Sequence, residues 1–452
     1  MAFQSLVFRV RKREPEFIVP AKPIPYEVKY LSDIDDREGL RFHVPKILFY
    51  RKKDFCMGST HKADDIVGVT KKALADALVF YYPFAGRLRE VPGGKLLVEC
   101  TAQGVLFIEA DADVSLEQLG GDFLKPPFPC LEQLLYTPSN SEDILSCPLL
   151  FVQVTRLMCG GFIFGLRYNH TICDGQGIHQ FVKALAEIAR GKVSPSILPV
   201  WERHLLNARD PPQVTFAHRE YDPPSNRNEK LPSLDDLNNV SSITPHLQAC
   251  TTFELLTAWL WRSRTIAVGY DPNEEVRVVI SVSTRGKFHS PLPTGFYGNT
   301  VAYPAAVSTT EKLIQNHLSF ALELVMQVKN EVNLMSVKGI PTISTLGTYF
   351  VSDMRHMGNA GEVDIGCREV VYDGPALGVN PTSHFWMSSP YISYTNNTGH
   401  KGCLVPIYLQ RLAMKKFLLE IESMVNKTAF VQTILQPETS KLSLTSFRKS
   451  SL

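Results

Sequence analysis

The length of the chain is the feature that most restricts its fold. A single hydrophobic core stops growing at roughly 250 to 300 residues, whereas this chain has 452. We therefore expect two domains. The apolar fraction of 44% and the charged fraction of 20% are ordinary for a globular protein, so each domain has enough apolar residues to bury a core.

Charge and cysteine usage disfavour several classes of protein. The net charge of +2 is too small to indicate nucleic acid as the main partner, and we interpret the basic clusters at 11–13 and 51–53 as solvated surface. A single anionic ligand with a few phosphates remains compatible with this balance. The nine cysteines are scattered and never form a CxxC pair, which predicts reduced thiols rather than a disulfide framework or a zinc site.

No part of the sequence resembles a membrane segment. A membrane-spanning helix needs a run of ~18 or more apolar residues, and no such run occurs here. The first residues also lack an apolar stretch that ends at a small-residue cleavage site for secretion. We expect a cytoplasmic protein that does not bind membranes, and we expect it to be a monomer.

Hydrophobic patterns predict alternating helices and strands in the first half of the chain. Residues 64–88 carry apolar positions at helical spacing as far as Pro83, where the helix should stop. Residues 95–100 and 105–110 have the composition of two strands separated by a turn. A helix is predicted again at 251–261, after a Pro-rich stretch that suits a connection between domains.

A strand hairpin is predicted directly before the most interesting histidine. Residues 149–156 and 162–168 read as two strands joined by a short turn that contains two glycines. Apolar residues between Ile178 and Ile188 then recur at helical spacing. His170 should therefore lie where a strand gives way to a helix.

His170 and Asp174 carry the clearest chemical potential in the sequence. An imidazole has a reference pKa of about 6.5, so a neutral His170 could accept a proton at cytosolic pH. The same spacing fits a buried, hydrogen-bonded histidine followed by an aspartate that caps a helix. Cys173 is a further candidate, as a nucleophile beside the imidazole. No additional His or carboxylate pair stands at ligand spacing, so no metal site is expected.

Sequence motifs of other enzyme classes are missing. The chain has no GxSxG nucleophile turn, no phosphate loop that ends in Gly-Lys-Ser/Thr, and no GxGxxG fingerprint after a strand. These gaps disfavour serine hydrolases, nucleotidases and dinucleotide-dependent oxidoreductases.

The sequence resembles the BAHD family of plant acyltransferases over nearly its whole length. The resemblance rests on five segments that occur together in one order: YPFAGRL at 82–88, HTICDG at 170–175, Phe253-Glu254 with Trp261-Arg262, STRGK at 283–287 and FYGN at 296–299. The stretch at 199–222 further resembles the branch that contains benzyl alcohol O-benzoyltransferases and methanol anthraniloyltransferases.

This resemblance implies an α/β fold of two similar-sized domains, each a mixed β-sheet flanked by helices, like chloramphenicol acetyltransferase, with a solvent channel at the interface. The N-terminal domain would span residues 1–205 and include a returning segment near 371–398. A Pro-rich crossover linker would span 206–232. The C-terminal domain would span 233–452 apart from the returning segment.

The resemblance also implies roles for individual residues. His170 would act as general base on the acceptor hydroxyl, and Asp174 would support the loop structurally by pairing with Arg285. Thr252 and Lys287 are candidates for binding acyl-CoA. No cofactor is implied, because the CoA thioester is a co-substrate.

The second signature of the family, DFGWG, is altered in this chain. It falls on Asp364-Ile365-Gly366-Cys367-Arg368, so both aromatic residues and the last glycine are replaced. Asp364 remains a candidate site residue. In the family this loop organises the domain interface and the CoA side of the channel. We therefore expect the replacements to alter CoA affinity and stability more than the type of reaction.

The sequence therefore predicts an acyl-CoA-dependent alcohol O-acyltransferase that forms an ester of a specialised metabolite. The branch that the chain resembles favours benzoyl-CoA or a similar aromatic or short branched acyl-CoA as the donor, and the acceptor is a small-molecule alcohol. Two alternatives stay open: a catalytically weakened paralogue that binds acyl-CoA or a metabolite, and an amine N-acyltransferase.

Overall fold

The structure is a computed structural model of the chain. It describes residues 8–53, 65–119, 125–128, 130–138, 143–145, 147–208, 211, 250–286, 291–331, 347–355, 357, 360–377, 388–395 and 401–435. The chain divides into two compact units. Unit 1 consists of Met1–Ser233, Arg277–Val307 and Met326–Ile407, and unit 2 consists of Leu234–Val276, Ser308–Val325 and Tyr408–Leu452. Most of the proposed linker at 206–232 lies outside the described residues, so the domain boundaries given above stay a prediction.

The largest sheet of unit 1 has seven strands in the order β1-β7-β8-β9-β4-β14, with β2 also paired to β7. Its strands are β1 (Val10–Lys12), β2 (Glu16–Ile18), β4 (His43–Lys52), β7 (Val105–Ala112), β8 (Leu150–Arg156), β9 (Phe162–Asn169) and β14 (Arg368–Pro375). β7 and β8 run parallel, whereas β8 and β9 form the antiparallel hairpin that the sequence predicts. The sheet is therefore mixed.

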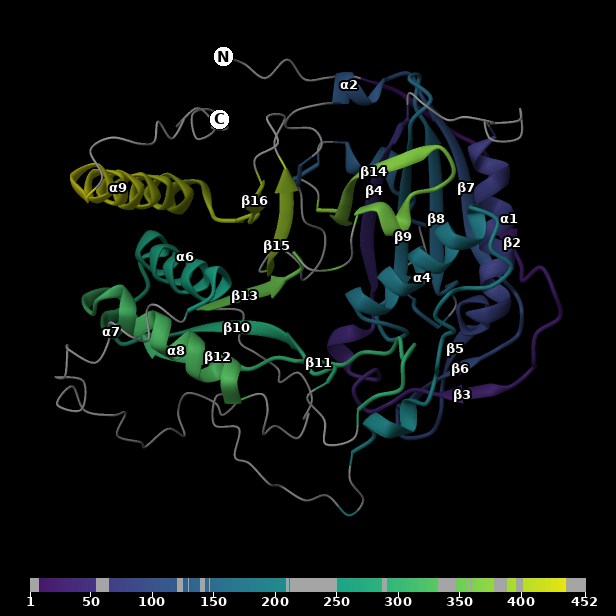
Figure 1. The fold of residues 1–452 in the computed structure, drawn as a ribbon. Coiled ribbons are helices and arrows are strands. Elements are labelled where there is room, and N and C mark those ends of the chain that lie inside the picture. The colour runs from purple at the N-terminus through teal and green to yellow at the C-terminus, as the bar shows by residue number, and fades with distance from the viewer. Residues whose placement is uncertain are drawn as a thin grey trace. The chain divides into compact units, whose positions relative to one another are not determined.

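Two helices, α1 (Ile66–Phe80) and α4 (Gly175–Ala189), cover one face of this sheet (Figure 1). α1 ends close to the predicted stop, and Pro83 lies in the short 3₁₀ helix η3 (Tyr82–Ala85) that follows it. Asp174 is the N-cap residue of α4, and its side chain accepts from the backbone N–H of Gly177.

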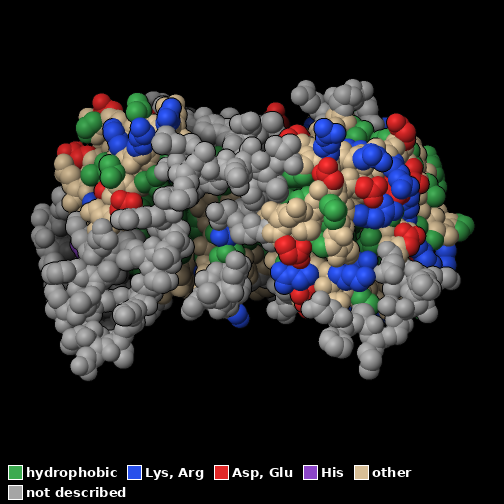
Figure 2. Space-filling view, turned by 90° about the horizontal axis from the view of Figure 1, so that it is seen from above, with side chains coloured by type: hydrophobic (Ala, Val, Ile, Leu, Met, Phe, Trp, Pro, Cys, Tyr) green, Lys and Arg blue, Asp and Glu red, His purple; other side chains and the backbone are tan. Residues whose placement is uncertain are grey.

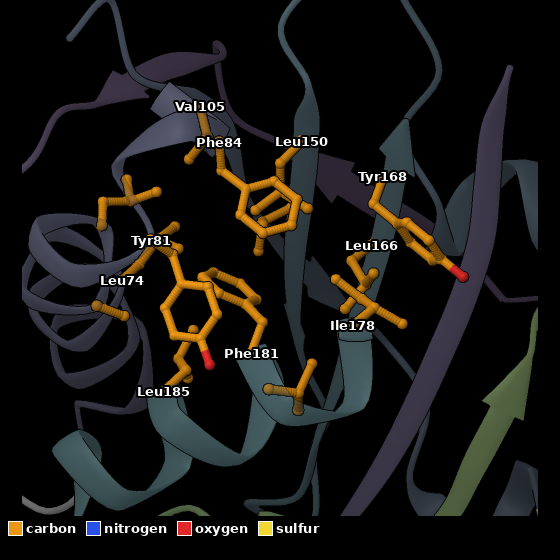
Figure 3. Packing of buried hydrophobic residues seen from close by; sticks show 14 of the residues in the cluster. Leu74, Tyr81, Phe84, Val105, Leu150, Leu166, Tyr168, Ile178, Phe181 and Leu185 are labelled. Carbon is orange, nitrogen blue, oxygen red and sulfur yellow. The ribbon is translucent and has the colours of Figure 1, made fainter. Parts of the chain in front are cut away.

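Figure 3 shows how the side chains of these helices meet those of the strands. Phe181 and Leu185 of α4 pack with Leu166 of β9 and Tyr81, and all four are at most 1% exposed. Burying one such side chain contributes roughly 1.5 to 3 kcal/mol. This core fixes the place where β9 gives way to α4, and hence the position of His170.

The other strands form two further sheets. A six-stranded mixed sheet has the order β11-β10-β13-β15-β16, with β12 paired to β10, and a three-stranded sheet has the order β3-β6-β5. The strands are β10 (Glu275–Ser283), β11 (Val301–Ala302), β12 (Ala305–Thr309), β13 (Thr348–Asp353), β15 (Ser388–Thr395), β16 (Lys401–Leu404), β3 (Val28–Tyr30), β5 (Arg87–Glu90) and β6 (Leu96–Glu99). Both strands predicted at 95–100 and 105–110 form, as β6 and β7, but they belong to different sheets.

The remaining helices include α6 (Thr252–Val268), α7 (Thr310–Gln315), α8 (Leu318–Glu331) and α9 (Arg411–Leu435), with the short elements α2 (Leu116–Leu119), α3 (Leu131–Leu134), η1 (Glu38–Leu40), η5 (Arg203–Leu206) and η11 (Ala360–Val363). α6 starts at a capping box in which Thr251 and Glu254 bond each other's backbone, and it packs against α9. Within the described residues, no helix is both long enough and apolar enough to cross a membrane.

The surface carries mixed charge. On the face in Figure 2, Lys and Arg side chains lie among Asp and Glu side chains. This mixture agrees with a net charge of only +2.

One prediction about the cysteines is wrong. Cys367 is disulfide-bonded, although we expected reduced thiols throughout. The other cysteines of the described residues form no disulfide: Cys100, Cys130, Cys147, Cys159, Cys173, Cys250 and Cys403. The scattered cysteines contain no CxxC pair or other spacing pattern that would indicate a disulfide at Cys367.

Candidate active site

His170 directly follows β9 and is tied to the neighbouring strand. Its backbone N–H donates to the carbonyl oxygen of Phe42, the residue before β4, at 2.9 Å. The imidazole lies edge-on to the ring of Phe42, 5.6 Å between centroids, and 6.2 Å from the ring of Tyr168. The residue is half-buried.

Burial lowers the pKa of His170 from its usual 6.5, because an environment of low polarity disfavours the charged imidazolium. The backbone of His170 itself, followed by Asp174, Asn299 and Asp35, raises this pKa, but burial outweighs them. The imidazole is therefore neutral at pH 7 and can accept a proton.

Asp174 joins three parts of the chain. Its carboxylate accepts from the N–H of Gly177 at 2.9 Å, which caps α4. Arg285 donates from Nη1 to Oδ2 at 2.7 Å and from Nη2 to Oδ1 at 3.1 Å, and the N–H of Thr300 donates to Oδ2 at 3.1 Å. The structure thus brings together Asp174 and Arg285. The sequence also left open a helix-capping role for Asp174. In the structure the same carboxylate both caps α4 and pairs with Arg285.

A second carboxylate–guanidinium pair lies beside the same loop. Asp35 and Arg203 are fully buried, and Arg203 Nη1 lies 2.9 Å from both carboxylate oxygens. Arg203 Nη2 donates to the carbonyl oxygen of Ile172 at 2.7 Å, two residues after His170. The guanidinium carbon lies 4.2 Å from the ring centre of Trp201 and 4.8 Å from that of Tyr297. Arg203 therefore holds the histidine loop, residues 170–174, at Ile172.

Residues 298–300, which we call the clamped segment, bond to both pairs. The carbonyl oxygen of Gly298 accepts from Arg285 at 2.7 Å, and the N–H of Asn299 donates to Asp35 at 2.9 Å. A Cβ atom on Gly298 would lie 2.1 Å from Arg203 Nη1, so only glycine fits there. The clamped segment and the histidine loop therefore form one rigid body of hydrogen bonds.

Sequence reasoning missed Asp35, Arg203 and Asn299 as site residues. Asn299 and Arg203 occur within segments that carry the family resemblance, which was the only available signal. Asp35 and Arg203 stand 168 positions apart, and no local spacing connects such a pair.

The alternatives to a histidine base receive little support from the geometry. Cys173 is fully buried, and burial raises the pKa of its thiol well above 9.0, so the reactive thiolate is disfavoured at neutral pH. Among the described residues, no group of three or more His, Cys, Asp or Glu side chains is arranged to hold a metal ion.

The remaining predicted site residues lie apart from this cluster or cannot be placed. Thr252 is exposed at the first position of α6 in unit 2. Lys287 lies outside the described residues. Asp364 accepts from Lys53 Nζ at 2.8 Å and from the N–H of Val370 at 2.9 Å, so its carboxylate ties η11 to β4 and β14.

The altered loop at 364–368 is attached mainly through its backbone. Arg190, at the end of α4, donates to the carbonyl oxygens of Asp364 and Glu362, and the N–H of Lys53 donates to the carbonyl oxygen of Cys367 at 2.9 Å. Ile365 is fully buried in the same core as α1 and α4. The loop is therefore well fixed without the two aromatic side chains of the family signature.

We expect the family signature, if restored, to destabilise this chain. In the variant Ile365→Phe/Cys367→Trp/Arg368→Gly, Phe overfills a packed core, Trp removes the disulfide, and Gly removes the bond from Arg368 to Gly160. Overpacking alone costs about 1 to 3 kcal/mol. The thermal transition should move down, whereas Ile365→Leu, which conserves volume, should change it little. A higher transition temperature in the triple variant would contradict this account of the loop.

We expect Asp174→Asn and Arg285→Ala to be strongly non-additive. Each substitution breaks the same pair of hydrogen bonds, so the double variant should lose less stability than the two losses added together, by about 0.5 to 3 kcal/mol. Denaturant unfolding of the four proteins measures this coupling. As a matched cycle, Lys72→Ala and Asp76→Asn disrupt an exposed pair with one 2.5 Å contact, for which little coupling is expected. Equal coupling in the two cycles would mean that the buried pair has no special role.

Comparison with known proteins gives a consistent result. The family model described as "Transferase family" matches residues 8–424. The chain is 51% identical over 450 residues to benzyl alcohol O-benzoyltransferase of Petunia hybrida, with 94% of this chain and 95% of the relative covered. It is 45% identical over 443 residues to alcohol acyl transferase 1 allele GSd of Malus domestica, with 92% and 94% covered. Among solved structures, vinorine synthase matches with a TM-score of 0.65 at 18% identity, covering 90% of this chain and 96% of the other.

Proposed function

The chain belongs to the BAHD acyltransferase family, and we propose that it transfers the acyl group of a CoA thioester to the hydroxyl of a small alcohol, with His170 as general base. The observation that carries this proposal is the state of His170, which is half-buried and neutral at pH 7. Its loop is held by the buried pair of Asp35 and Arg203 and the part-buried pair of Asp174 and Arg285. A base must be uncharged and correctly placed before the substrate arrives.

The proposed reaction passes through no acyl-enzyme. The imidazole takes the proton of the acceptor hydroxyl as the hydroxyl oxygen bonds to the thioester carbonyl carbon. The C–S bond then breaks, and the proton passes from the imidazolium to the departing thiolate, which gives an ester and free CoA. Asp174 and Arg285 take no part in these proton transfers, because their hydrogen bonds are committed to α4 and the clamped segment. No cofactor other than the co-substrate is required.

We propose benzoyl-CoA or a similar aromatic acyl-CoA as the donor. The relative from Petunia hybrida is named for benzoyl transfer to benzyl alcohol, and its identity of 51% extends over nearly the whole chain. The relative from Malus domestica is named only for alcohols in general, which keeps aliphatic acceptors among the candidates. The cytoplasmic location and the monomeric state stay predictions from the sequence.

A panel assay tests the function. The purified full-length protein is incubated with aromatic, short branched and straight-chain acyl-CoA thioesters, each with pooled alcohols or pooled amines. Free CoA is followed with a thiol reagent, and the products are identified by mass spectrometry. We expect esters, with the highest rate from benzoyl-CoA. Amide products alone would identify an N-acyltransferase, and benzoyl-CoA binding without any product would identify the weakened paralogue that the altered loop at 364–368 suggests.

A further inference from the structure

Three polar side chains near the end of β9 carry buried nitrogen atoms that lack a hydrogen-bond partner within the part of the chain that the structure describes. They are Nε of Arg167 and Nδ2 of Asn169, both on β9, and Nδ1 of His43 on β4. Asn169 is fully buried and His43 is 8% exposed. Buried polar atoms are almost always paired in folded proteins, so three unpaired nitrogens in one region require an explanation.

The strand register places these three side chains on one face of the large sheet. Successive side chains of a strand point to opposite faces, and Tyr168 of β9 packs in the core with α1 and α4. Arg167 and Asn169 therefore point to the other face. His43 pairs with Asn169 across β4 and β9, so it shares that face. The ring of His43 lies 4.8 Å from the ring of Phe151, and Phe151 pairs with Arg167.

The known hydrogen bonds of His43 and Asn169 decide which of their atoms donate. His43 Nε2 lies 3.0 Å from the carbonyl oxygen of Pro148, which only accepts, so Nε2 carries the hydrogen. Burial lowers the pKa of His43 from 6.5 to about 4, although the bond to Pro148 opposes this shift, so Nδ1 has a free lone pair at pH 7. Asn169 Oδ1 accepts from the N–H of Thr171 at 3.1 Å, which fixes Nδ2 as the free donor.

Arg167 adds a positive charge that no carboxylate of the described residues balances. Burial lowers its pKa, and no acidic group opposes this shift. The guanidinium nevertheless stays protonated in proteins. A charge that is largely removed from water is unfavourable without a counter-ion, and an anion that meets the planar fork relieves this cost. The residue as a whole is partly exposed, so a small molecule can reach the fork from solution.

We propose that Arg167, Asn169 and His43 form a binding site for a small hydroxycarboxylate, a monoanion with a hydroxyl group next to its carboxylate. The guanidinium and the Asn169 amide donate to the carboxylate oxygens, and His43 Nδ1 accepts the hydrogen of the hydroxyl. A doubly charged anion fits less well, because the site holds one positive charge. The ligand connects β4 to the end of β9. This inference is independent of the proposed acyl transfer, since it is tested by binding alone.

Three matched probes test the site in the full-length wild-type protein. Glycolate has a carboxylate and a hydroxyl, acetate has only the carboxylate, and ethylene glycol has only hydroxyls. In ligand-observed NMR titrations at constant ionic strength, we expect a Kd of about 1 mM or lower for glycolate. Acetate should bind about 10-fold more weakly, because it leaves the lone pair of His43 unpaired. Ethylene glycol should not bind.

Two results with these probes would overturn the proposal. Equal affinities for glycolate and acetate would show that no hydroxyl is recognised. No saturable binding of glycolate would show that the three nitrogens meet only water. Bicarbonate also combines a negative charge with a hydroxyl, so it competes against glycolate in a parallel titration. Tighter binding of glycolate supports an organic ligand, whereas tighter binding of bicarbonate would replace the hydroxycarboxylate by an inorganic ion.

Arg167→Met tests the charge. We expect it to weaken glycolate binding about 10-fold or more, because the charge-assisted bonds are lost. Its thermal stability without ligand should be kept or raised, since an unbalanced charge is removed. The matched control is Arg89→Met on β5, which removes an arginine side chain that is 51% exposed and paired with Glu99. The control should bind glycolate like the wild type. Wild-type affinity in Arg167→Met, or an equal loss in both variants, would overturn the site.

His43→Phe tests the acceptor. The variant keeps a ring against Phe151 and removes the lone pair of Nδ1. The preference for glycolate over acetate should therefore disappear, while acetate binds as it does to the wild type. A preference that persists would show that another group accepts the hydroxyl and would overturn the assignment of His43. The probe titrations of the wild type decide the proposal even if this variant fails to fold.

Discussion

His170→Ala should lose nearly all turnover while it still binds the CoA thioester within a few-fold of the wild-type affinity. Removal of a general base typically lowers the rate by ~10² to 10⁴. Thioester binding should persist because the imidazole acts on the proton of the acceptor and does not hold the donor. Single-turnover kinetics with benzoyl-CoA, together with calorimetric titration of CoA, separate these two quantities.

The control for this variant is His204→Ala, an exposed histidine in the short helix η5. It should keep wild-type kcat and KM. In the wild type, kcat/KM should fall as the pH drops through the lowered pKa of His170, because protonation removes the base; the midpoint of this fall should lie below pH 6.5. If His170→Ala kept more than about a tenth of wild-type kcat, the assignment of the base would be wrong.

Arg203→Met should produce the largest loss of stability among single substitutions at the site. It removes the positive partner of Asp35 and leaves a fully buried carboxylate without its counter-charge. Breaking a buried pair by removing one partner typically costs about 3 to 5 kcal/mol. The contacts of the guanidinium with the rings of Trp201 and Tyr297 are lost as well. Unfolding by urea, followed by tryptophan fluorescence, measures the change.

The double variant Arg203→Met/Asp35→Asn distinguishes charge from packing. Asn at position 35 removes the unpaired charge, so the double variant should be more stable than Arg203→Met alone. Lys72→Met serves as the surface control, because it removes one positive charge from an exposed pair and should change stability by less than about 0.5 kcal/mol. A double variant that is less stable than Arg203→Met would mean that packing against the rings, and not the buried charge, dominates.

The local part of this fold could be predicted from the sequence. The hairpin of β8 and β9 and the helix α4 follow from periodicity over short stretches, and they place His170 at a junction between strand and helix. The strand pairing of β6 and β7 with other strands could not be predicted, because nearby strands need not be partners. Pairing is decided by burial of faces that only the folded chain brings together.

The residues of the candidate site likewise fall into those that the sequence could locate and those that it could not. His170 and Asp174 lie in one short motif, so the sequence located them. Asp35, Arg203 and Asn299 come from three distant segments and meet only because the core fixes the ends of those segments. Their chemical importance follows from complete burial, which a single sequence does not state.

The attachment of the loop at 364–368 through carbonyl oxygens has an evolutionary consequence. Every amino acid supplies the same backbone oxygen, so the bonds from Arg190 and from the N–H of Lys53 survive any replacement of the side chains that carry those oxygens. These backbone bonds place no demand on the side chains of the pentapeptide, so its remaining sequence constraints come from the burial of Ile365, the disulfide at Cys367 and the bond from Arg368 to Gly160. A genome survey that selects enzymes by the letters DFGWG would therefore discard this chain, although its loop is anchored through its backbone.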